Sequence, residues 1–129
     1  MEPEQSGLIL VVDGHSDYRT TLAGMLKEQG FRVIIAPDVA TAIHQLRSAQ
    51  ALSLVITNDK LEDGSALNVL DYAQQQDPPI PVVVMSFVFG KRTRLPQDKW
   101  VDMGAAGTFL KTATLKEILA LVRTHARKL

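Results

Sequence analysis

The chain has 129 residues, which suffice for one domain with one apolar core and leave no room for a second. It contains no cysteine, which excludes disulfide frameworks and thiolate metal sites and fits a reducing cytoplasm, where we expect the protein. Lys plus Arg and Asp plus Glu number 14 each, and such a neutral chain is a poor candidate for direct binding of nucleic acid. No apolar run approaches the roughly 20 residues of a membrane span. The acidic, polar segment Met1–Gly7 is unlike a signal peptide, so we expect a flexible tail there.

In the first half of the chain, apolar runs alternate with segments of helical periodicity. Ser16 is a candidate cap for a first helix, which Gly30 would end. Asp38 is placed to cap a second helix, in which apolar residues recur at helical spacing. The apolar runs are typical of strands buried on both faces, as in parallel sheets. The predicted strands of this half are Leu8–Val12, Phe31–Ile35 and Leu52–Thr57.

The second half continues this alternation, with a less regular stretch in its middle. Ser65 is placed to open a third helix. A short fourth helix is predicted to start at Pro96 and to end at Gly104. Thr114 and Glu117 form a capping box that opens the last helix. The remaining predicted segments are the strand Pro81–Met85, the loop Phe87–Leu95 and the weaker strand Gly107–Leu110.

Five strands alternating with five helices predict a doubly wound α/β fold, in which a parallel sheet carries helices on both faces. In such sheets, binding and active sites lie at the carboxyl ends of the strands. Asp13 follows the first predicted strand, Asn58 and Asp59 follow the third, and Ser86 and Lys111 follow the fourth and fifth. A carboxylate, an amide, a hydroxyl and an ammonium group are therefore expected to meet at one edge. Because burial without a partner is costly for a lysine, we expect Lys111 within hydrogen-bonding or water-bridging reach of Asp13 or Asn58.

Four segments of the chain resemble the receiver domains of two-component response regulators, which are CheY-like in fold. Together, in this order and at this spacing, they are fairly specific and cover nearly the whole chain. The resemblance implies one receiver-like domain with the strand order 2-1-3-4-5 and a role in signal transduction or transcriptional control. The segments are LILVVDGHSDYR (Leu8–Arg19), LVITNDKLEDGSALNVL (Leu54–Leu70), PVVVMS (Pro81–Ser86) and GAAGTFLKT (Gly104–Thr112).

The resemblance also implies a set of site residues, which this chain matches only in part. Family members carry an acidic pair after the first strand, which holds Mg²⁺, and a phosphate-accepting aspartate after the third. Asp13 matches the first acid, but Gly14 replaces the second and Asn58 stands at the acceptor position. The hydroxyl and ammonium groups that bind the phosphoryl group in the family are retained as Ser86 and Lys111.

These replacements remove the groups on which the chemistry of the family depends. An amide has negligible nucleophilicity, so Asn58 cannot form an acyl phosphate. Mg²⁺ prefers carboxylate oxygens, and Asp13 is the only one of three expected carboxylates that remains, so we expect Mg²⁺ binding to be weak or absent. Thr108 stands where many members place an aromatic switch residue, and Ser86 and Lys111 are interpreted as relics. The chain is therefore predicted to be a pseudo-receiver, a regulatory module that is not an enzyme and needs no cofactor.

Two alternatives stay open from the sequence. A phosphorylatable receiver would use Asp59 or Asp63 as its acceptor. A flavodoxin-like nucleotide binder is disfavoured, because the first loop, Asp13–Asp17, lacks a glycine-rich cradle for phosphate groups.

A candidate interface surrounds the end of the fourth strand and the fourth helix. Trp100 stands where a small residue usually lets that helix lie against the sheet, so we expect a helix that is short, displaced outward, or rotated so that Trp100 packs at its edge. Family members commonly pair or dock partners on this face. We therefore expect a protein partner, a second copy of the chain, or an output domain outside this sequence. The candidate interface residues are Phe87, Phe89, Lys91, Arg92, Arg94 and Trp100.

Overall fold

The structure is a computed structural model that describes residues 7–48, 51–92 and 94–128, so all but Gly7 of the predicted tail lies outside the described residues. Within these ranges, the helices are α1 (Ser16–Glu28), α2 (Val39–Ser48), α3 (Ala66–Gln74), α4 (Gln97–Asp102) and α5 (Leu115–His125). The strands are β1 (Leu8–Val12), β2 (Arg32–Ala36), β3 (Leu52–Asn58), β4 (Lys60–Leu61), β5 (Gly64–Ser65), β6 (Val82–Ser86) and β7 (Gly107–Leu110).

The main sheet has the topology that the sequence predicts. Its strands are parallel and lie in the order β2-β1-β3-β6-β7, which is the order 2-1-3-4-5 when the strands of this sheet are counted along the chain. The doubly wound α/β fold class is therefore confirmed. A separate antiparallel hairpin of β4 and β5, which the sequence patterns did not predict, connects the carboxyl end of β3 with α3.

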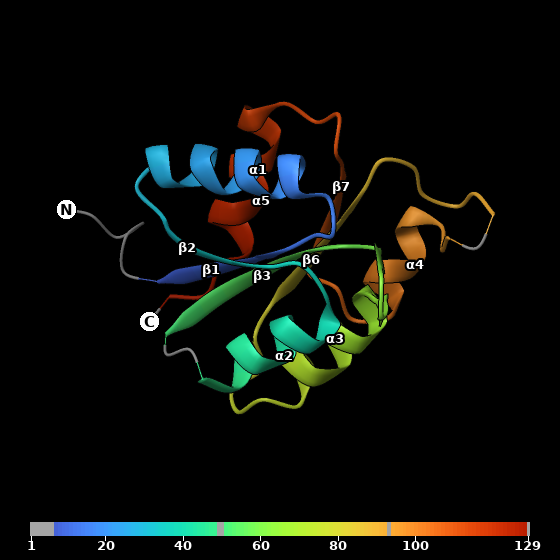
Figure 1. Cartoon of the computed structure of the whole chain (residues 1–129), viewed down its shortest axis with the longest axis horizontal. Coiled ribbons are helices and arrows are strands. Elements are labelled where there is room, and N and C mark those ends of the chain that lie inside the picture. The colour runs from blue at the N-terminus through green and yellow to red at the C-terminus, as the bar shows by residue number, and fades with distance from the viewer. Residues whose placement is uncertain (1–6, 49–50, 93, 129) are drawn as a thin grey trace.

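Helices cover both faces of the sheet (Figure 1). α1 and α5 lie on one face and α2 and α3 on the other, with α4 next to the end of the sheet that β7 forms. Side chains of each strand alternate between the two faces. In β1, Leu10 and Val12 join the core that includes residues of α2 and α3, whereas Ile9 and Val11 join the core that includes residues of α1 and α5. Every residue of β1 and β3 is buried, as expected for central strands that are covered on both faces.

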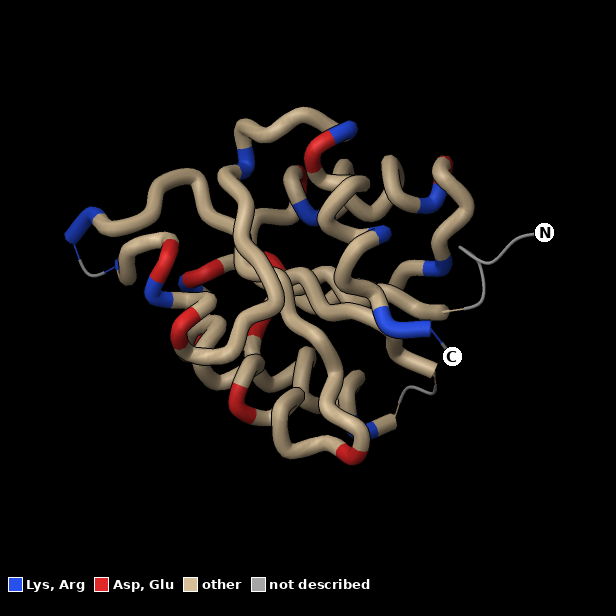
Figure 2. The backbone as a smooth tube through the Cα atoms, turned by 180° about the vertical axis from the view of Figure 1, so that it is seen from behind, with Lys and Arg blue, Asp and Glu red and all other residues tan. Residues whose placement is uncertain are grey.

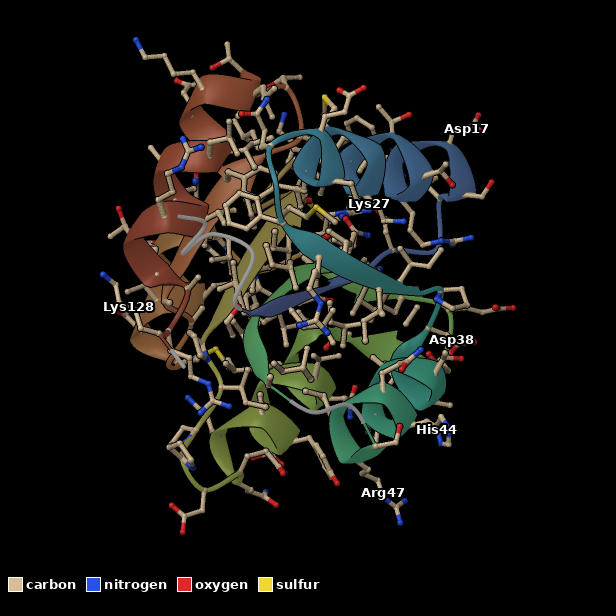
Figure 3. The ribbon with its side chains drawn as sticks, turned by 90° about the vertical axis from the view of Figure 1, so that its left-hand side faces the viewer. Asp17, Lys27, Asp38, His44, Arg47 and Lys128 are labelled. Atoms are coloured by element: carbon tan, nitrogen blue, oxygen red, sulfur yellow. The ribbon has the colours of Figure 1, made fainter. Side chains whose placement is uncertain are left out.

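Hydrogen-bonding side chains fix three of the helix starts that the sequence predicts, and a glycine follows the end of α1 as predicted. Asp38, which Figure 3 shows at the start of α2, accepts a hydrogen bond from the Thr41 N–H at 2.8 Å. Ser65 and Thr114 each form a capping box at the starts of α3 and α5. Gly30 has a φ of 98°, the left-handed conformation that suits glycine after the end of a helix.

The predicted cap at Ser16 is wrong. Ser16 is the first residue of α1, and the residue before it, His15, makes no side-chain cap. The His15 N–H instead donates to Asp13 Oδ1 at 3.0 Å, so the carboxylate of Asp13 holds the turn before the helix.

The helices turn polar faces away from the sheet. On α2, His44 and Arg47 point away from the sheet, whereas Ala42 and Leu46 are buried (Figure 3).

Among the helices of the described ranges, none combines the length and the apolar character that crossing a membrane requires.

The fourth helix, α4, is short as predicted, but its Trp100 is buried. α4 has only 6 residues, which confirms a short helix at this position. Trp100, however, is 2% exposed and belongs to the core cluster that also contains Val82, Val84 and Ala105. Its place in the candidate interface was therefore wrong, because burial of the large apolar indole in the core outweighs an edge position. Val101 and Met103 are the exposed apolar residues of this region.

Candidate functional site

The carboxyl edge of the sheet brings the predicted polar residues together. Asp13 and Asn58 follow a register pair of β1 and β3, so they come next to each other on neighbouring strands. Ser86 ends β6 and is paired with the residue before Lys111, which follows β7. All four side chains are buried. The expected meeting of a carboxylate, an amide, a hydroxyl and an ammonium group at one edge is confirmed.

Asp13 and Lys111 form a buried ion pair across this edge. Lys111 Nζ lies 2.6 Å from Asp13 Oδ2, and both side chains are 0% exposed. The lysine reaches from β7 over the ends of β6 and β3 to the carboxylate after β1. The other carboxylate oxygen, Asp13 Oδ1, accepts the hydrogen bond from His15. The contact predicted for Lys111 is therefore confirmed, and each charge has the partner that its burial requires.

Aromatic rings enclose the Lys111 ammonium group. Its Nζ lies 4.7 Å from the ring centroid of Tyr18 and 4.7 Å from that of Phe87, within the range of cation–π contacts. Phe87 also packs edge-on against His15 and Tyr18, with ring centroids 6.2 Å and 6.1 Å apart. Burial, helped by the negative charge of Asp13, raises the pKa of Tyr18 to about 12. At neutral pH the ion pair is therefore walled by a neutral phenol and a phenyl ring.

Asn58 is the last residue of β3, and its side-chain amide binds the backbone of the segment that follows. The side chain is 4% exposed, and Nδ2 donates a hydrogen bond to the Lys60 carbonyl oxygen at 2.7 Å. Its Oδ1 is buried and has no hydrogen-bond partner among the residues that the structure describes. The arrangement holds the β4–β5 hairpin against the end of β3, and it offers no nucleophile at this position.

Asp59, the next residue, forms a second ion pair at the same edge. Its carboxylate is 1% exposed, and Oδ1 lies 2.5 Å from Nη1 of Arg94, from the loop between β6 and α4. Arg94 Nη1 also donates to Ser86 Oγ at 3.0 Å. Ser86 Oγ in turn donates to the Val88 carbonyl oxygen at 2.7 Å and accepts from the Val88 N–H at 3.1 Å. One donor and two acceptor positions saturate a hydroxyl, so the hydrogen-bonding capacity of Ser86 is used within the chain.

Asp63, between β4 and β5, caps the start of α2. Its Oδ1 accepts from the Val39 N–H at 2.8 Å and its Oδ2 from the Ala40 N–H at 3.0 Å, so it caps the start of α2 from 24 residues away. The hydrogen bond from Val39, with a further one from Ala40, lowers the pKa of Asp63 against the opposing effect of partial burial.

The residues present do not fit the Mg²⁺ site that the family resemblance implies. Mg²⁺ needs several oxygen ligands in octahedral geometry. The carboxylate of Asp13 is already engaged by Lys111 and His15, and Gly14 contributes no ligand side chain. In the part of the chain that the structure describes, no three His, Cys, Asp or Glu residues are grouped to hold a metal ion.

Gly14 and Thr108 lie at the margin of the site. A Cβ at Gly14 would come no closer than 3.6 Å to the Pro37 carbonyl oxygen, an ordinary contact, so nothing in its surroundings requires a glycine there. Thr108 is half-buried, and its hydroxyl accepts a hydrogen bond from Gln97 Nε2 at 2.9 Å. Gln97, at the start of α4, thus contacts the residue that the resemblance assigns to the aromatic switch position.

The candidate interface residues of the β6–α4 loop do not form one surface. Figure 2 shows this loop projecting from the body with basic residues at its far end, where Lys91 and Arg92 are exposed. Phe87 is 56% exposed, whereas Phe89 is half-buried and packs against the core. Arg94 points away from the exposed Lys91 and Arg92, because its guanidinium group pairs with the buried Asp59. Its partner lies 35 residues away, so no local pattern in the sequence indicated this contact.

Comparisons with known proteins agree with the fold. The response regulator receiver domain family matches residues 9–123. The DNA-binding transcriptional regulator NtrC of Bradyrhizobium sp. (strain RP501 Parasponia) is 29% identical over 117 residues, which are 91% of this chain and 24% of that protein. The photosynthetic apparatus regulatory protein RegA of Rhodovulum sulfidophilum is 24% identical over 121 residues, 94% of this chain and 64% of that protein. The chain thus spans about a quarter of the first relative and less than two thirds of the second.

Solved structures show the same fold at low sequence identity. A two-component response regulator from Clostridium difficile is 22% identical, with a TM-score of 0.78 over 92% of this chain and 93% of that one. A response regulator receiver protein from Pseudomonas putida is 24% identical, with a TM-score of 0.76 over 92% of this chain and 96% of that one.

Proposed function

The chain belongs to the response regulator receiver domain family, and from this membership we propose that it is a pseudo-receiver, a regulatory module that works without phosphorylation. It acts through protein contacts and not as an enzyme, in the cytoplasm, with no direct contact to nucleic acid or membrane. A receiver regulates a partner through the carboxyl edge of its sheet. In this chain, contacts between its own residues fix the conformation of that edge.

The observation that carries the proposal is Asn58 at the end of β3. This residue follows the register pair of Val12 and Thr57 and so lies beside Asp13. The resemblance to the family assigns Asn58 to the position of the acceptor carboxylate. Transfer of a phosphoryl group needs an oxygen nucleophile, and the amide of Asn58 supplies none. Its Nδ2 is also committed to the Lys60 carbonyl oxygen at 2.7 Å.

The retained Lys111 and Ser86 support the same conclusion, because their charge and hydrogen-bonding groups are already paired within the chain. Lys111 pairs with Asp13 at 2.6 Å between two aromatic rings. The Ser86 hydroxyl is saturated by Val88 and Arg94. A phosphoryl group at this edge would therefore have to break internal contacts before it gained any.

Neither alternative acceptor is free. Asp59 is buried in its ion pair with Arg94, and attack on a phosphodonor would require that pair to open. Asp63 caps α2 through both of its carboxylate oxygens. We propose that both residues are structural.

Intact-mass spectrometry after incubation with acetyl phosphate and Mg²⁺ tests the proposal. We expect no increase in mass by one phosphoryl group for the wild-type chain. A stoichiometric increase would refute it, and the variants Asp59→Asn and Asp63→Asn would then identify the acceptor as the residue whose loss abolishes the increase.

We further propose that the partner contacts the face formed by α4 and β7. Val101 and Met103 on this side are 50% and 41% exposed, and Leu110 of β7 is 40% exposed. Because the NtrC relative is a DNA-binding transcriptional regulator, we propose that an output domain outside this sequence controls transcription. Sedimentation velocity separates the choices: self-association that Val101→Glu abolishes indicates a homodimer, and a monomer indicates a different protein or an output domain.

A further inference from the structure

One arginine of the loop between β6 and α4, Arg94, contacts the carboxyl edge of the sheet. Arg94 Nη1 contacts Asp59 Oδ1 at 2.5 Å and Ser86 Oγ at 3.0 Å. The Arg94 side chain is 27% exposed and the Asp59 side chain only 1%, so the charge that most needs a partner is the carboxylate. A residue of the loop thus supplies the counter-ion of a residue buried in the sheet.

Asp59 cannot follow the loop, because its main chain is held on both sides. Its N–H donates to the Met85 carbonyl oxygen at 2.9 Å, and its carbonyl oxygen accepts from the Ala66 N–H at 3.0 Å. Its second carboxylate oxygen, Oδ2, is buried with no hydrogen-bond partner among the described residues. The position of the Asp59 carboxylate is therefore fixed at the edge of the sheet and does not depend on the loop. The contact forms only when the loop brings Arg94 to Asp59.

The loop is folded so that Arg94 can reach this position. The Gly90 N–H donates to the Leu95 carbonyl oxygen at 2.9 Å, and the Arg94 N–H donates to the Lys91 carbonyl oxygen at 3.0 Å. Phe89 and Leu95, on the two sides of the loop, pack against the core. Two internal hydrogen bonds and two apolar anchors thus close the base of the loop and direct Arg94 inward.

We propose that Arg94 is an internal latch: its contacts with Asp59 and Ser86 hold the β6–α4 loop against the carboxyl edge and keep that edge in one state without any bound ligand. The inference rests on the proposed function, because only a site without metal ion and phosphoryl group leaves Asp59 and Ser86 to a cation of the chain. The position of the loop then depends on whether the Arg94–Asp59 contact is made or broken.

Hydrogen–deuterium exchange of the loop residues 87–92, 94 and 95 tests the latch, with Arg94→Gln as the variant and Lys91→Gln as the matched control. Lys91 lies in the same loop and is exposed, so its replacement removes one positive charge without touching Asp59. We expect exchange in the loop to be at least about tenfold faster in Arg94→Gln and unchanged in Lys91→Gln. Equal exchange in both variants would overturn the proposal.

A second variant separates the latch from a general loss of stability. Arg94→Gln leaves Asp59 buried without a counter-ion, so its Tm should fall by about 10 °C. Adding Asp59→Asn removes the unpaired charge, so the double variant should recover most of that Tm while loop exchange stays fast. It also provides the exchange test if Arg94→Gln alone does not fold. Slow exchange in the double variant would overturn the latch.

The two proposals fail separately. Phosphorylation of the wild-type chain would refute the pseudo-receiver and leave the exchange result standing. Wild-type exchange in Arg94→Gln would refute the latch and say nothing about the acceptor position.

Discussion

Replacing Lys111 with methionine should destabilise the fold strongly, because the Asp13 carboxylate would stay buried without its counter-ion. The two groups are 2.6 Å apart and both side chains are 0% exposed, so water cannot readily take the place of the ammonium group. Loss of one member of a buried ion pair costs about 3–5 kcal/mol. Methionine keeps the length and apolar contacts of the lysine stem, so the loss reports mainly on the charge. For a chain of 129 residues this corresponds to a fall in Tm of about 10–20 °C.

Urea denaturation followed by circular dichroism measures this loss, and a double-mutant cycle assigns it. Asp13→Asn combined with Lys111→Met removes both charges, so the double variant should be about 2 kcal/mol more stable than Lys111→Met alone. Lys116→Met, at an exposed position of α5, is the matched control and should change the free energy of unfolding by no more than about 0.5 kcal/mol. A loss below about 1 kcal/mol for Lys111→Met, or strict additivity in the cycle, would refute the reasoning.

Three further predictions concern groups around the site and the core. Tyr18→Phe removes a buried hydroxyl for which the described part of the chain offers no hydrogen-bond partner, so thermal denaturation at pH 7 should show no loss beyond about 0.5 kcal/mol. Because the pKa of Tyr18 is raised to about 12, wild-type stability should fall as the pH rises from about 10 to 12, and this part of the slope should vanish in the variant. Asp63→Ala removes the two hydrogen bonds that Asp63 accepts at the start of α2, while the cap by Asp38 stays, and should lower the Tm by about 2–4 °C at pH 7. Since the folded pKa of Asp63 is lowered, that difference from the wild type should shrink as the pH falls below about 4. Trp100→Ala should cost about 3–5 kcal/mol in urea denaturation, and acrylamide should quench the emission of the buried wild-type indole poorly.

The sequence predicts those parts of the fold whose signals are local. Buried strands such as β1 are continuous apolar runs, and the capping boxes at Ser65 and Thr114 depend on residues three positions apart. The hairpin of β4 and β5 was not predicted, because strands of two residues are too short to show any periodicity. Ser16 failed as a cap because a hydroxyl before an apolar segment fits both the cap and the first helical turn.

The candidate site was predictable where topology alone brings residues together. The pairing of Asp13 with Lys111 follows from parallel strands that end at one edge. The contacts of Arg94 with Asp59 and of Asp63 with α2 join residues 35 and 24 positions apart, through loops whose course no local pattern determines. Trp100 could not be placed either, because a large apolar residue in a short helix suits an edge and a core equally until the packing is known.

Restoring the missing carboxylates tests most directly whether this is a receiver whose chemistry has been removed. Gly14→Asp has room for its Cβ, and Asn58→Asp introduces a carboxylate next to Asp13 on the neighbouring strand. The measurement is the Tm of the wild type, the two single variants and the double variant, each with and without Mg²⁺. Without the metal, like charges should lower the Tm of the double variant, and Mg²⁺ should raise it again by several degrees, with little response in the other three. A Tm that is independent of Mg²⁺ in all four proteins would contradict the account, since Asp13, Gly14 and Asn58 would then not share a site.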